Sequence, residues 1–592
     1  MQATPIWLGR DDRPLLGFLH APADGSARGG VVVCPPFDRD YMHAHYALRM
    51  LAEELCERGL CVLRFDYAGT GDSAGRADDP DRLEAWLGSV KAALETVRTT
   101  GVSSVSMVGM RIGGTLAGVA AARDGGVDAM VLWDPVGSGR AYLAEQRALA
   151  ALAFGGRDAP PGREGEDDGA VETPGMRFDG ATARDLATLD LVRTPGPLAR
   201  RILVLSRSGA PEGRLGARLD LPHVEWGEAT GQDRLMDVGS PNQVLPAATI
   251  ERAARWLGAT APATAVRLRL PAAAGPATVD HGPDGSPVVE TPTALGPARL
   301  FGVVTEVPGR SSGPTVVFIN VANEHRLGPA RLWVELARRW ATLGIRSARI
   351  DLSGLGDSPT RRPGQPRFVT RAPEAFDDLQ DACRALSPDD PSDVVLIGLC
   401  ASAYQALDSA FDVHPRGVVS INPVLSFRPP EVAGGGAVDP RRHAAIPRRP
   451  ATQALHGNGP IVGLRHRVPR LAARIRDLVE GVEGLLAPRR QRPVVWLGEL
   501  AARDVDVLVV CGEREARPIR LSGSARSLRR LERSGRFHLE LVPGLEHGLL
   551  RSDQRLEVVD LVSRYVLSLS AHWAPAPVGD PLRLAEPAPA HP

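Results

Sequence analysis

The segment VVLIGLCASAYQAL, residues 394–407, joins an apolar run to the start of a helical pattern through a tight turn. Its first part is a short continuous apolar run, which is typical of a strand whose two faces are both covered. Cys400 occupies the turn, with Gly398 two residues before it and Ser402 two residues after it. A sharp strand-to-helix turn needs small residues at these two positions. The segment therefore predicts a strand, a turn and a helix, with Cys400 as either a nucleophile or a small core residue.

A second segment in the chain has the same shape. SVSMVGMRIGGTLAGVA, residues 104–120, places Arg111 where the first segment has Cys400. GLCVLRFDYAGTGDSAG (59–75) likewise matches GIRSARIDLSGLGDSPT (344–360). The two halves of the chain therefore repeat one pattern.

Each half alternates short apolar runs with helical patterns, which argues for a parallel α/β sheet. At 592 residues the chain is also too long for one ordinary core. The fold class that we expect is α/β, with two tandem units built on mostly parallel, doubly wound sheets. The expected boundaries are a first domain at 1–258, an Ala/Pro/Gly-rich linker at 259–285, a second domain at 286–570 and a disordered Pro/Ala-rich tail at 571–592.

Composition excludes several classes of function. The formal net charge is zero, which gives no reason to expect nucleic acid or an anionic membrane as a partner. Six cysteines without regular spacing or a CxxC motif do not make a disulfide framework, so a reducing cytoplasm is expected. Residues 1–17 lack a signal-peptide pattern, and no apolar stretch approaches the roughly 18 residues of a membrane span. No metal-ligand cluster or dinucleotide fingerprint is found, so neither metal nor cofactor is expected.

Four short motifs connect both halves to a known superfamily. They are LRFDYAGTGDSAG (63–75) and GMRIG (109–113) in the first half, and RIDLSGLGDS (349–358) and GLCAS (398–402) in the second. Together they resemble the α/β-hydrolase superfamily, and in particular its serine-aminopeptidase-like members, including those associated with exosortase systems. The resemblance covers nearly all of both halves. It is specific for fold and weak for substrate, because this fold hosts many chemistries.

The resemblance implies a catalytic triad in the second half. In this superfamily the order along the chain is nucleophile, acid and base. Cys400 would be the nucleophile, and Glu515 in LVVCGEREARP (508–518) would be the acid, with Glu513 as the alternative. His547, in a Gly-containing loop before the last helix, would be the base. Most free cysteines are buried small residues, but three triad parts in the correct order favour a nucleophile here.

The same resemblance predicts where an oxyanion would bind. The N–H groups at the start of the helix after Cys400 point toward the turn and would favour a thiolate. The second donor would come from the loop NVANEHRLGP, residues 320–329. The expected groups are the N–H of Ala401, the N–H of Val321 or Ala322, and the side chain of His325, with Arg326 beside it. The loop side chains could equally form a surface at a helix entry.

The first half lacks every part of the triad. Arg111 stays protonated and has no lone pair to offer as a nucleophile. The acid position falls near Ala210, and no histidine occurs between His223 and His281. The first domain is therefore predicted to be catalytically inactive. Arg111 would either bind a carboxylate or phosphate, or form a salt bridge that plugs the site; the salt bridge is the simpler interpretation.

An insertion at about 425–500 would form the lid over the second site. Residues 428–492 contain thirteen arginines, against six acidic residues within 431–499. This surplus predicts an acidic partner, such as a carrier protein or a coenzyme A thioester, unless it is only a solvated face. The corresponding insertion in the first half, 156–175, is acidic.

These features favour an enzyme that uses a Cys-His-Glu triad for acyl transfer or for hydrolysis of an ester or thioester. Thiolates attack thioesters readily, and the resulting acyl-enzyme remains reactive toward amines. A role in lipid or natural-product biosynthesis is therefore expected over peptide hydrolysis. Two alternatives remain open: a non-hydrolytic epimerase or cyclase on the same fold, and a pseudoenzyme scaffold that binds an acidic partner.

Overall fold

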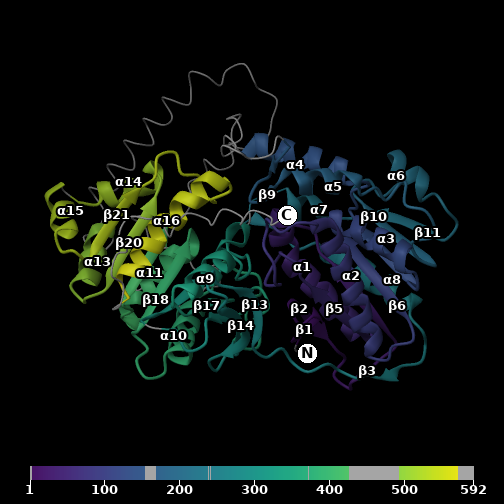
Figure 1. The fold of residues 1–592 in the computed structure, drawn as a ribbon, viewed down its shortest axis with the longest axis horizontal. Coiled ribbons are helices and arrows are strands. Elements are labelled where there is room, and N and C mark those ends of the chain that lie inside the picture. Colours follow the sequence, from purple (N-terminus) through teal and green to yellow (C-terminus); the bar gives the residue numbers. More distant parts are fainter. Residues whose placement is uncertain are drawn as a thin grey trace, which may run out of the picture.

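The computed structural model describes residues 3–153, 169–237, 239, 242–311, 313–370, 372–425, 492–523 and 525–570. It contains two α/β units, which lie side by side (Figure 1). Most of the predicted lid, most of the predicted acidic insertion and the predicted tail lie outside the described residues.

The first unit is built on an eight-stranded sheet in the order β1-β2-β5-β4-β6-β7-β10-β11. The strands in this order are β1 (Thr4–Arg10), β2 (Arg13–His20), β5 (Leu60–Phe65), β4 (Gly29–Cys34), β6 (Val105–Met110), β7 (Ala129–Trp133), β10 (Arg201–Ser206) and β11 (Val224–Glu228). β2 pairs antiparallel with β1 and β5, whereas all pairs from β5 to β11 are parallel. The central strands are buried apolar runs, because helices cover both faces.

The second unit repeats this order and adds one strand at the edge. Its nine strands are β13 (Ala277–His281), β14 (Pro287–Leu295), β15 (Leu300–Glu306), β17 (Ser347–Ile350), β16 (Thr315–Ile319), β18 (Val394–Leu399), β19 (Gly417–Ile421), β20 (Asp506–Cys511) and β21 (Phe537–Leu541). The pairs from β13 to β17 are antiparallel and the remaining pairs are parallel. The register also matches, since Gly17 pairs with Phe65 in the first sheet and Gly302 pairs with Ile350 in the second. The predicted fold class, two α/β units with mostly parallel sheets, is thus confirmed.

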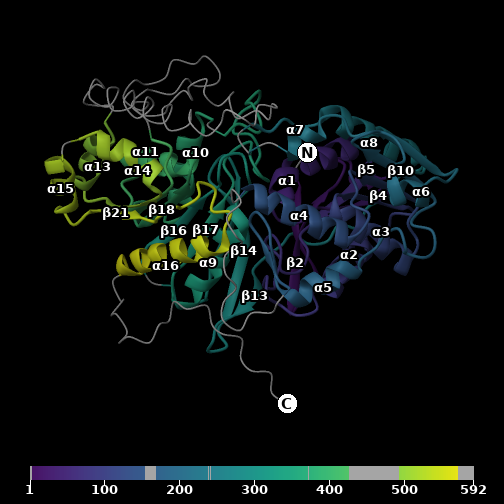
Figure 2. The same cartoon turned by 90° about the horizontal axis from the view of Figure 1, so that it is seen from above.

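Helices cover the sheets on both sides. In the first unit they are α1 (Asp38–Glu57), α2 (Arg82–Thr99), α3 (Ile112–Asp124), α4 (Gly139–Ala153), α5 (Gly180–Thr188), α6 (Gly213–Arg218), α7 (Gln232–Met236) and α8 (Ala247–Thr260). In the second they are the short η2 (Pro329–Arg331), α9 (Leu332–Thr342), α10 (Ala375–Leu386), α11 (Ala401–Val413), α13 (Pro493–Ala501), α14 (Glu513–Leu521), α15 (Ala525–Glu532) and α16 (Ser552–Ser568). In the second unit, α9 and α16 lie on one face of the sheet, opposite α10, α11 and α13 (Figure 2).

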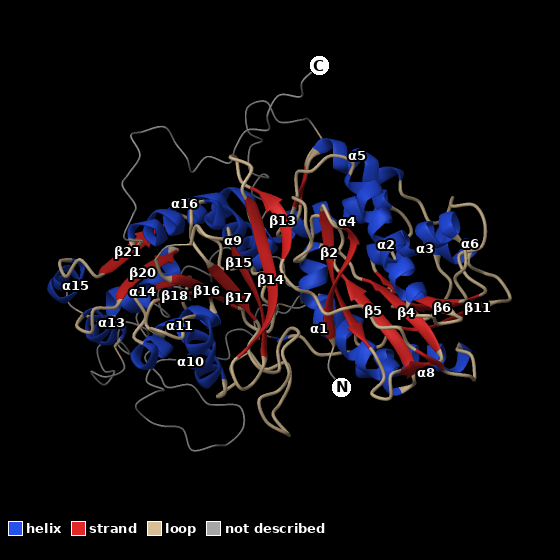
Figure 3. Cartoon of the chain, turned by 60° about the horizontal axis from the view of Figure 1, so that its bottom comes forward, coloured by secondary structure: helices blue, strands red, loops and turns tan. Residues whose placement is uncertain are grey.

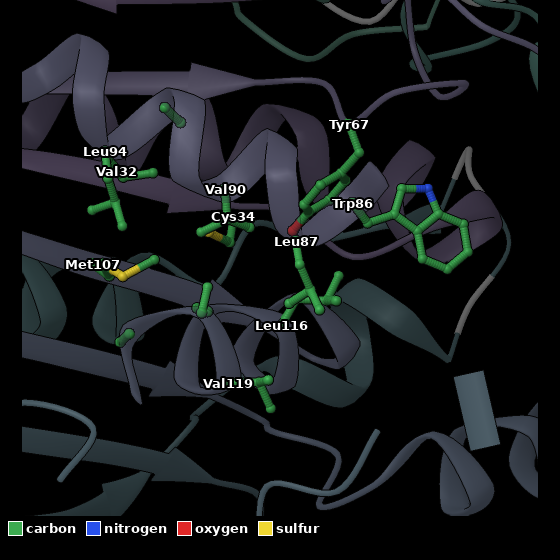
Figure 4. Packing of buried hydrophobic residues seen from close by; sticks show 14 of the residues in the cluster. Val32, Cys34, Tyr67, Trp86, Leu87, Val90, Leu94, Met107, Leu116 and Val119 are labelled. Atoms are coloured by element: carbon green, nitrogen blue, oxygen red, sulfur yellow. The ribbon is translucent and has the colours of Figure 1, made fainter. Parts of the chain in front are cut away.

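One apolar core of the first unit lies between the sheet and the helices α2 and α3, and another lies on the opposite face against α1 and α8. Trp86 and Tyr67 are fully buried in the first of these cores beside Leu87 and Leu116 (Figure 4). The Tyr67 hydroxyl donates a hydrogen bond to the carbonyl of Pro35 over 3.0 Å, so its polar end is satisfied inside the core. This bond ties the segment after β5 to the end of β4, which pairs with β6, the strand that leads to Arg111.

The predicted linker, 259–285, contains strands from both units. β12 (Val266–Arg267) pairs with β3 (Ser26–Ala27) of the first unit. β13 then opens the sheet of the second unit. This stretch of chain therefore binds to both units by strand pairing.

A buried set of ion pairs joins the two units, whose sheets approach each other at β2 and at β13 and β14 (Figure 3). Arg64 of the first unit pairs with Asp357 of the second over 2.6 Å. Arg349 of the second unit pairs with Asp72 of the first over 3.0 Å. These two pairs are reciprocal, because the residues come from matching positions of the two repeats. Arg326 lies between them and contacts both aspartates, at 2.7 Å from Asp72 and 2.9 Å from Asp357.

Candidate active site

Cys400 occupies a strained turn between β18 and α11. Its φ and ψ are 60° and −111°, a conformation that is uncommon for a residue with a side chain. Its N–H donates to the carbonyl of Ile421 over 3.0 Å, which ties the turn to the neighbouring strand β19. A Cβ at Gly398 would lie 2.2 Å from the carbonyl oxygen of Ser402, so this turn requires glycine at that position. The local structure is the strand-turn-helix that the sequence predicts.

Cys400 is the most exposed of the six cysteines. It is half-buried, whereas the other five are buried. Burial raises the pKa of Cys34, Cys61, Cys383 and Cys511 to about 12, which keeps those thiols protonated and unreactive.

His547 contacts both Cys400 and Glu515. The Nδ1 atom of His547 is 3.3 Å from Oε1 of Glu515, which sits in the first turn of α14. The pKa of His547 is lowered by burial, but hydrogen bonds and charge from Cys400 and Glu515 outweigh that effect and raise it to about 10. The structure thus brings the three predicted triad residues together. Glu513, the alternative acid, is exposed to solvent two residues earlier.

Burial raises the pKa of Glu515, but its hydrogen bond to His547 and the charge of that imidazole have the larger combined effect and lower it. The carboxylate and the imidazolium therefore stabilise each other's charged form. An imidazolium beside a thiol is the arrangement that stabilises a thiolate.

Asn422 and Glu546 hold the His547 loop, and neither role was predicted from the sequence. Asn422, buried at the end of β19, donates from Nδ2 to the carbonyls of Glu546 and His547 over 3.1 and 3.2 Å. The Glu546 carboxylate accepts hydrogen bonds from the N–H groups of Gly548 and Leu550 over 3.0 and 2.7 Å. The sequence does contain one indication of Asn422: INPV (421–424) in the second repeat matches WDPV (133–136) in the first, so Asn422 corresponds to Asp134.

The predicted oxyanion donors Val321 and Ala322 follow β16, which pairs in parallel with β18, the strand that leads to Cys400. Val321 and Ala322 are buried in the same apolar cluster against which Cys400 packs. Ala322 has a positive φ of 49°, so the chain bends sharply just after β16. Ala401 is the first residue of α11, where backbone N–H groups have no partner within the helix.

His325 lies at the junction of the two units. Its ring stacks on His45 of the first unit, with centroids 3.9 Å apart, and it meets Tyr41 edge-on. Burial, with His45 and Arg326 nearby, holds the pKa of His325 well below its ordinary value, so the ring is neutral. Its neighbour Arg326 is buried among the aspartates of the interface, so the contacts of both loop side chains are at the interface.

The turn of the first unit has the same strained geometry but a different chemistry. Arg111 has φ and ψ of 54° and −126° and donates its N–H to the carbonyl of Trp133. Its guanidinium pairs with Asp40 at 3.5 Å, with Asp134 at 3.3 Å and with Glu145. These carboxylates outweigh burial and raise the pKa of Arg111. The Arg111 guanidinium is thus surrounded by carboxylates of its own chain. This arrangement agrees with a salt bridge that plugs the site.

Among the described residues, no group of His, Cys, Asp and Glu has the arrangement of a metal site. No helix in the described part of the chain is long and apolar enough to cross a membrane.

No protein-family model matches the chain, and no curated protein matches it. Several solved structures are similar to it. Est1E from Butyrivibrio proteoclasticus is 17% identical, with a TM-score of 0.26, over 34% of this chain and 77% of its own. The Pyrobaculum calidifontis esterase is 17% identical, with a TM-score of 0.29, over 48% of this chain and 84% of its own. XC6422 from Xanthomonas campestris, an α/β serine hydrolase without a lid, is 14% identical, with a TM-score of 0.26, over 48% of this chain and 97% of its own.

Proposed function

We propose that this chain is an enzyme of the α/β-hydrolase type that transfers or hydrolyses acyl groups through a covalent intermediate on Cys400. The observation that carries the proposal is the position of His547 between the Cys400 thiol and the Glu515 carboxylate, at a strained turn that holds Cys400 half-exposed. Acyl transfer requires a nucleophile, a base within hydrogen-bonding reach and a group that orients the base.

The first chemical step forms a bond between Cys400 Sγ and the carbonyl carbon of an ester or thioester. The carbonyl oxygen becomes an oxyanion, which would accept hydrogen bonds from the N–H of Ala401 and from that of Val321 or Ala322. When the tetrahedral intermediate collapses, the bond to the leaving group breaks and His547 gives that group a proton. Glu515 keeps the imidazole oriented and stabilises its cation throughout.

The second step releases the acyl group. His547 takes a proton from water or from an acceptor nucleophile, which attacks the thioester carbon on Cys400. The Cys400 thiolate leaves, and the enzyme returns to its starting state. Because thiolates exchange readily with thioesters, an acyl thioester is the substrate class that suits Cys400 best. A coenzyme A thioester or an acyl carrier protein would supply such a group.

The first unit contributes no catalytic group in this proposal. Arg111 occupies the position of the nucleophile, and three carboxylates hold it. The first unit then acts on the reaction only through its contacts with the second.

The test is to incubate the full chain with short and long acyl coenzyme A thioesters and to look for an acylated protein by intact mass. Peptide mapping should place the acyl group on Cys400. Cys400→Ala should lose about 1,000-fold or more in activity, because the covalent route is closed. Cys383→Ala, at a buried cysteine of the same unit, is the matched control and should retain the activity.

Two results would count against this mechanism. If Cys400→Ala keeps its activity while His547→Ala loses it, the chain performs proton transfer without a covalent intermediate. If no acyl group is trapped and Cys400 does not react with a thiol reagent, the chain is a binding protein and not an acyl-transfer enzyme.

A further inference from the structure

The loop that carries His547 is held partly by the first unit. This loop runs from the end of β21 to the start of α16. The N–H of Gly175, in the first unit, donates to the carbonyl of Leu550 over 3.1 Å. The N–H of Ser552 donates to Oε1 of Glu172, also in the first unit, over 3.0 Å. Two hydrogen bonds thus cross the interface within five residues of His547.

The His547 loop needs such support because its backbone is strained. Leu549 has a φ of 55°, a region in which a bulky residue is a clear outlier. Its side chain is fully buried. Strain of this kind persists only where the surroundings fix the chain. Arg555 provides one restraint from within the second unit, by donating to the carbonyls of Leu549 and Leu550 over 3.0 and 2.7 Å.

Carboxylates of the first unit also act on Arg555, the side chain that restrains the loop. Burial lowers the pKa of Arg555, while the carboxylates of Glu172, Glu335 and Asp38 act to raise it. Glu172 and Asp38 belong to the first unit, so carboxylates from across the interface act electrostatically on the guanidinium that holds the loop. The Glu172 side chain is only 6% exposed, which strengthens its electrostatic effect on these groups.

The contacting segment is a hairpin anchored in the first unit. β8 (Val171–Glu172) pairs antiparallel with β9 (Arg177–Phe178), which lies on the side of the first unit that faces the second (Figure 1). Val171 and Phe178 are buried in the core of the first unit. Between the strands, the Thr173 hydroxyl donates to Asp38 at the start of α1 over 2.6 Å. The tip of the hairpin, Glu172–Gly175, is therefore a fixed element and not a loose loop.

We infer that the hairpin tip Glu172–Gly175 positions the His547 loop, so that the first unit, which has no triad of its own, sets the geometry of the site in the second. Glu172 is a positioning residue in this inference, because it acts on His547 only through the backbone of the loop. The inference rests on the proposed function, since it assigns a role in the pairing of His547 with Cys400.

The experiment compares the full-length wild type with Glu172→Ala and Glu172→Gln. The readout is the rate at which iodoacetamide alkylates Cys400, measured across pH by mass spectrometry. Glu172→Ala removes both the acceptor for Ser552 and the charge near Arg555, and should slow alkylation at neutral pH about fivefold, as expected for the loss of one hydrogen bond. The alkylation profile should also move to higher pH, because a displaced imidazolium supports the thiolate form less well. Glu172→Gln retains an acceptor oxygen and should recover part of the rate.

Glu53→Gln is the matched control. Glu53 also pairs across the interface, with Arg367 over 2.9 Å, but it contacts no part of the His547 loop in the described structure. Its alkylation rate should equal that of the wild type. Thermal unfolding of each variant separates loss of fold from loss of positioning, since a positioning effect appears in molecules that unfold at the wild-type temperature.

The outcomes separate the two proposals. If wild-type Cys400 reacts no faster than a simple thiol and carries no acyl group, the proposed function and the inference both fail. If the wild type reacts quickly and Glu172→Ala matches it in rate and in pH profile, only the positioning role is wrong. If Glu172→Ala and Glu53→Gln slow alkylation equally, the effect belongs to the interface as a whole, and the role of the hairpin is again refuted.

Discussion

The charge on His547 is set by two residues that lie far apart in the sequence. Cys400 ends a central strand, while Glu515 begins a helix after a later strand. Each lies at the carboxyl end of a parallel strand, and such ends meet at one edge of the sheet. Their combined effect raises the pKa of His547 to about 10, so the imidazolium is the main form at neutral pH. Cys400 and Glu515 together therefore control the protonation state on which the proposed chemistry depends.

Glu515→Gln should lower the rate of acylation about 100-fold, because the imidazole loses both its orientation and the partner of its cation. The basic limb of the pH–rate profile should move to lower pH, since the His547 pKa falls without the carboxylate. Glu513→Gln is the control, because its carboxylate is exposed and should change the rate less than about twofold. Steady-state rates of both variants across pH provide the measurement, and equal losses would contradict the assignment of Glu515.

The raised pKa of His547 also predicts how stability depends on pH. A histidine whose pKa is higher in the folded protein stabilises the fold fully below its unfolded pKa of about 6.5. That contribution is lost as the pH rises through the folded value of about 10. His547→Gln lacks it at every pH. The difference in thermal midpoint between wild type and His547→Gln should therefore be largest near pH 6 and smallest above pH 10; a difference that does not change with pH would contradict the raised pKa.

At the scale of the element, the two turns have the same backbone and opposite chemistry. Cys400 and Arg111 both have positive φ, and both turns begin two residues after a glycine that tolerates no side chain. The turn at Cys400 presents a half-exposed thiol, whereas the turn at Arg111 ends in a guanidinium surrounded by acids. The backbone of the turn is thus a shared scaffold, and the residue placed on it decides what the unit can do.

Gly398→Ala should destabilise the second unit by about 1–3 kcal/mol, because its Cβ would lie 2.2 Å from the carbonyl oxygen of Ser402. Cys400 would be displaced, so its alkylation should slow as well. Gly498→Ala, in the helix α13, is the matched control: a Cβ there meets nothing within 4 Å, and the change should stabilise the helix by about 0.5–1 kcal/mol. Denaturant unfolding of both variants checks the signs, and a stable Gly398→Ala would mean that the turn can relax.

Sequence patterns predict the parallel strands and the turns, because buried strands are apolar throughout and the turns require small residues in fixed positions. The antiparallel edge was not predicted. β13 and β14 expose part of their length, so they lack a continuous apolar run. The contacts of Asn422 and Glu172 depend on which segments meet in space, and local patterning does not encode this. His325 shows the same limit: its loop was located from the sequence, but its neighbours come from the other half of the chain.

At the scale of the whole molecule, the two units are joined by ion pairs whose charged groups are buried away from solvent. Arg349, Asp72 and Glu290 are all fully buried, and each carboxylate lies 3.0 Å from the guanidinium. Burying ions costs several kcal/mol each unless the partners are well placed. The interface therefore depends strongly on every member of the network being present.

Arg349→Met should destabilise the chain by about 3–5 kcal/mol, because it leaves two buried carboxylates without this partner. Arg201→Met is the surface control: Arg201 pairs with Glu225 over 2.7 Å, but both side chains are about half exposed, so the loss should stay below about 1 kcal/mol. Chemical denaturation of the two variants in parallel measures the free energy of unfolding of each. Equal losses of this free energy would show that water reaches the interface.

The reciprocal pairing of Arg64 with Asp357 and of Arg349 with Asp72 has the form of a contact between two subunits related by a two-fold axis. In a dimer of separate chains, such a contact weakens on dilution. Here both partners belong to one polypeptide, so each faces the other at an effective concentration set by the connecting chain. Association of the two units is then independent of how much protein the cell makes. A freely diffusing partner could not hold the His547 loop in every molecule at low abundance, whereas a covalently attached one can.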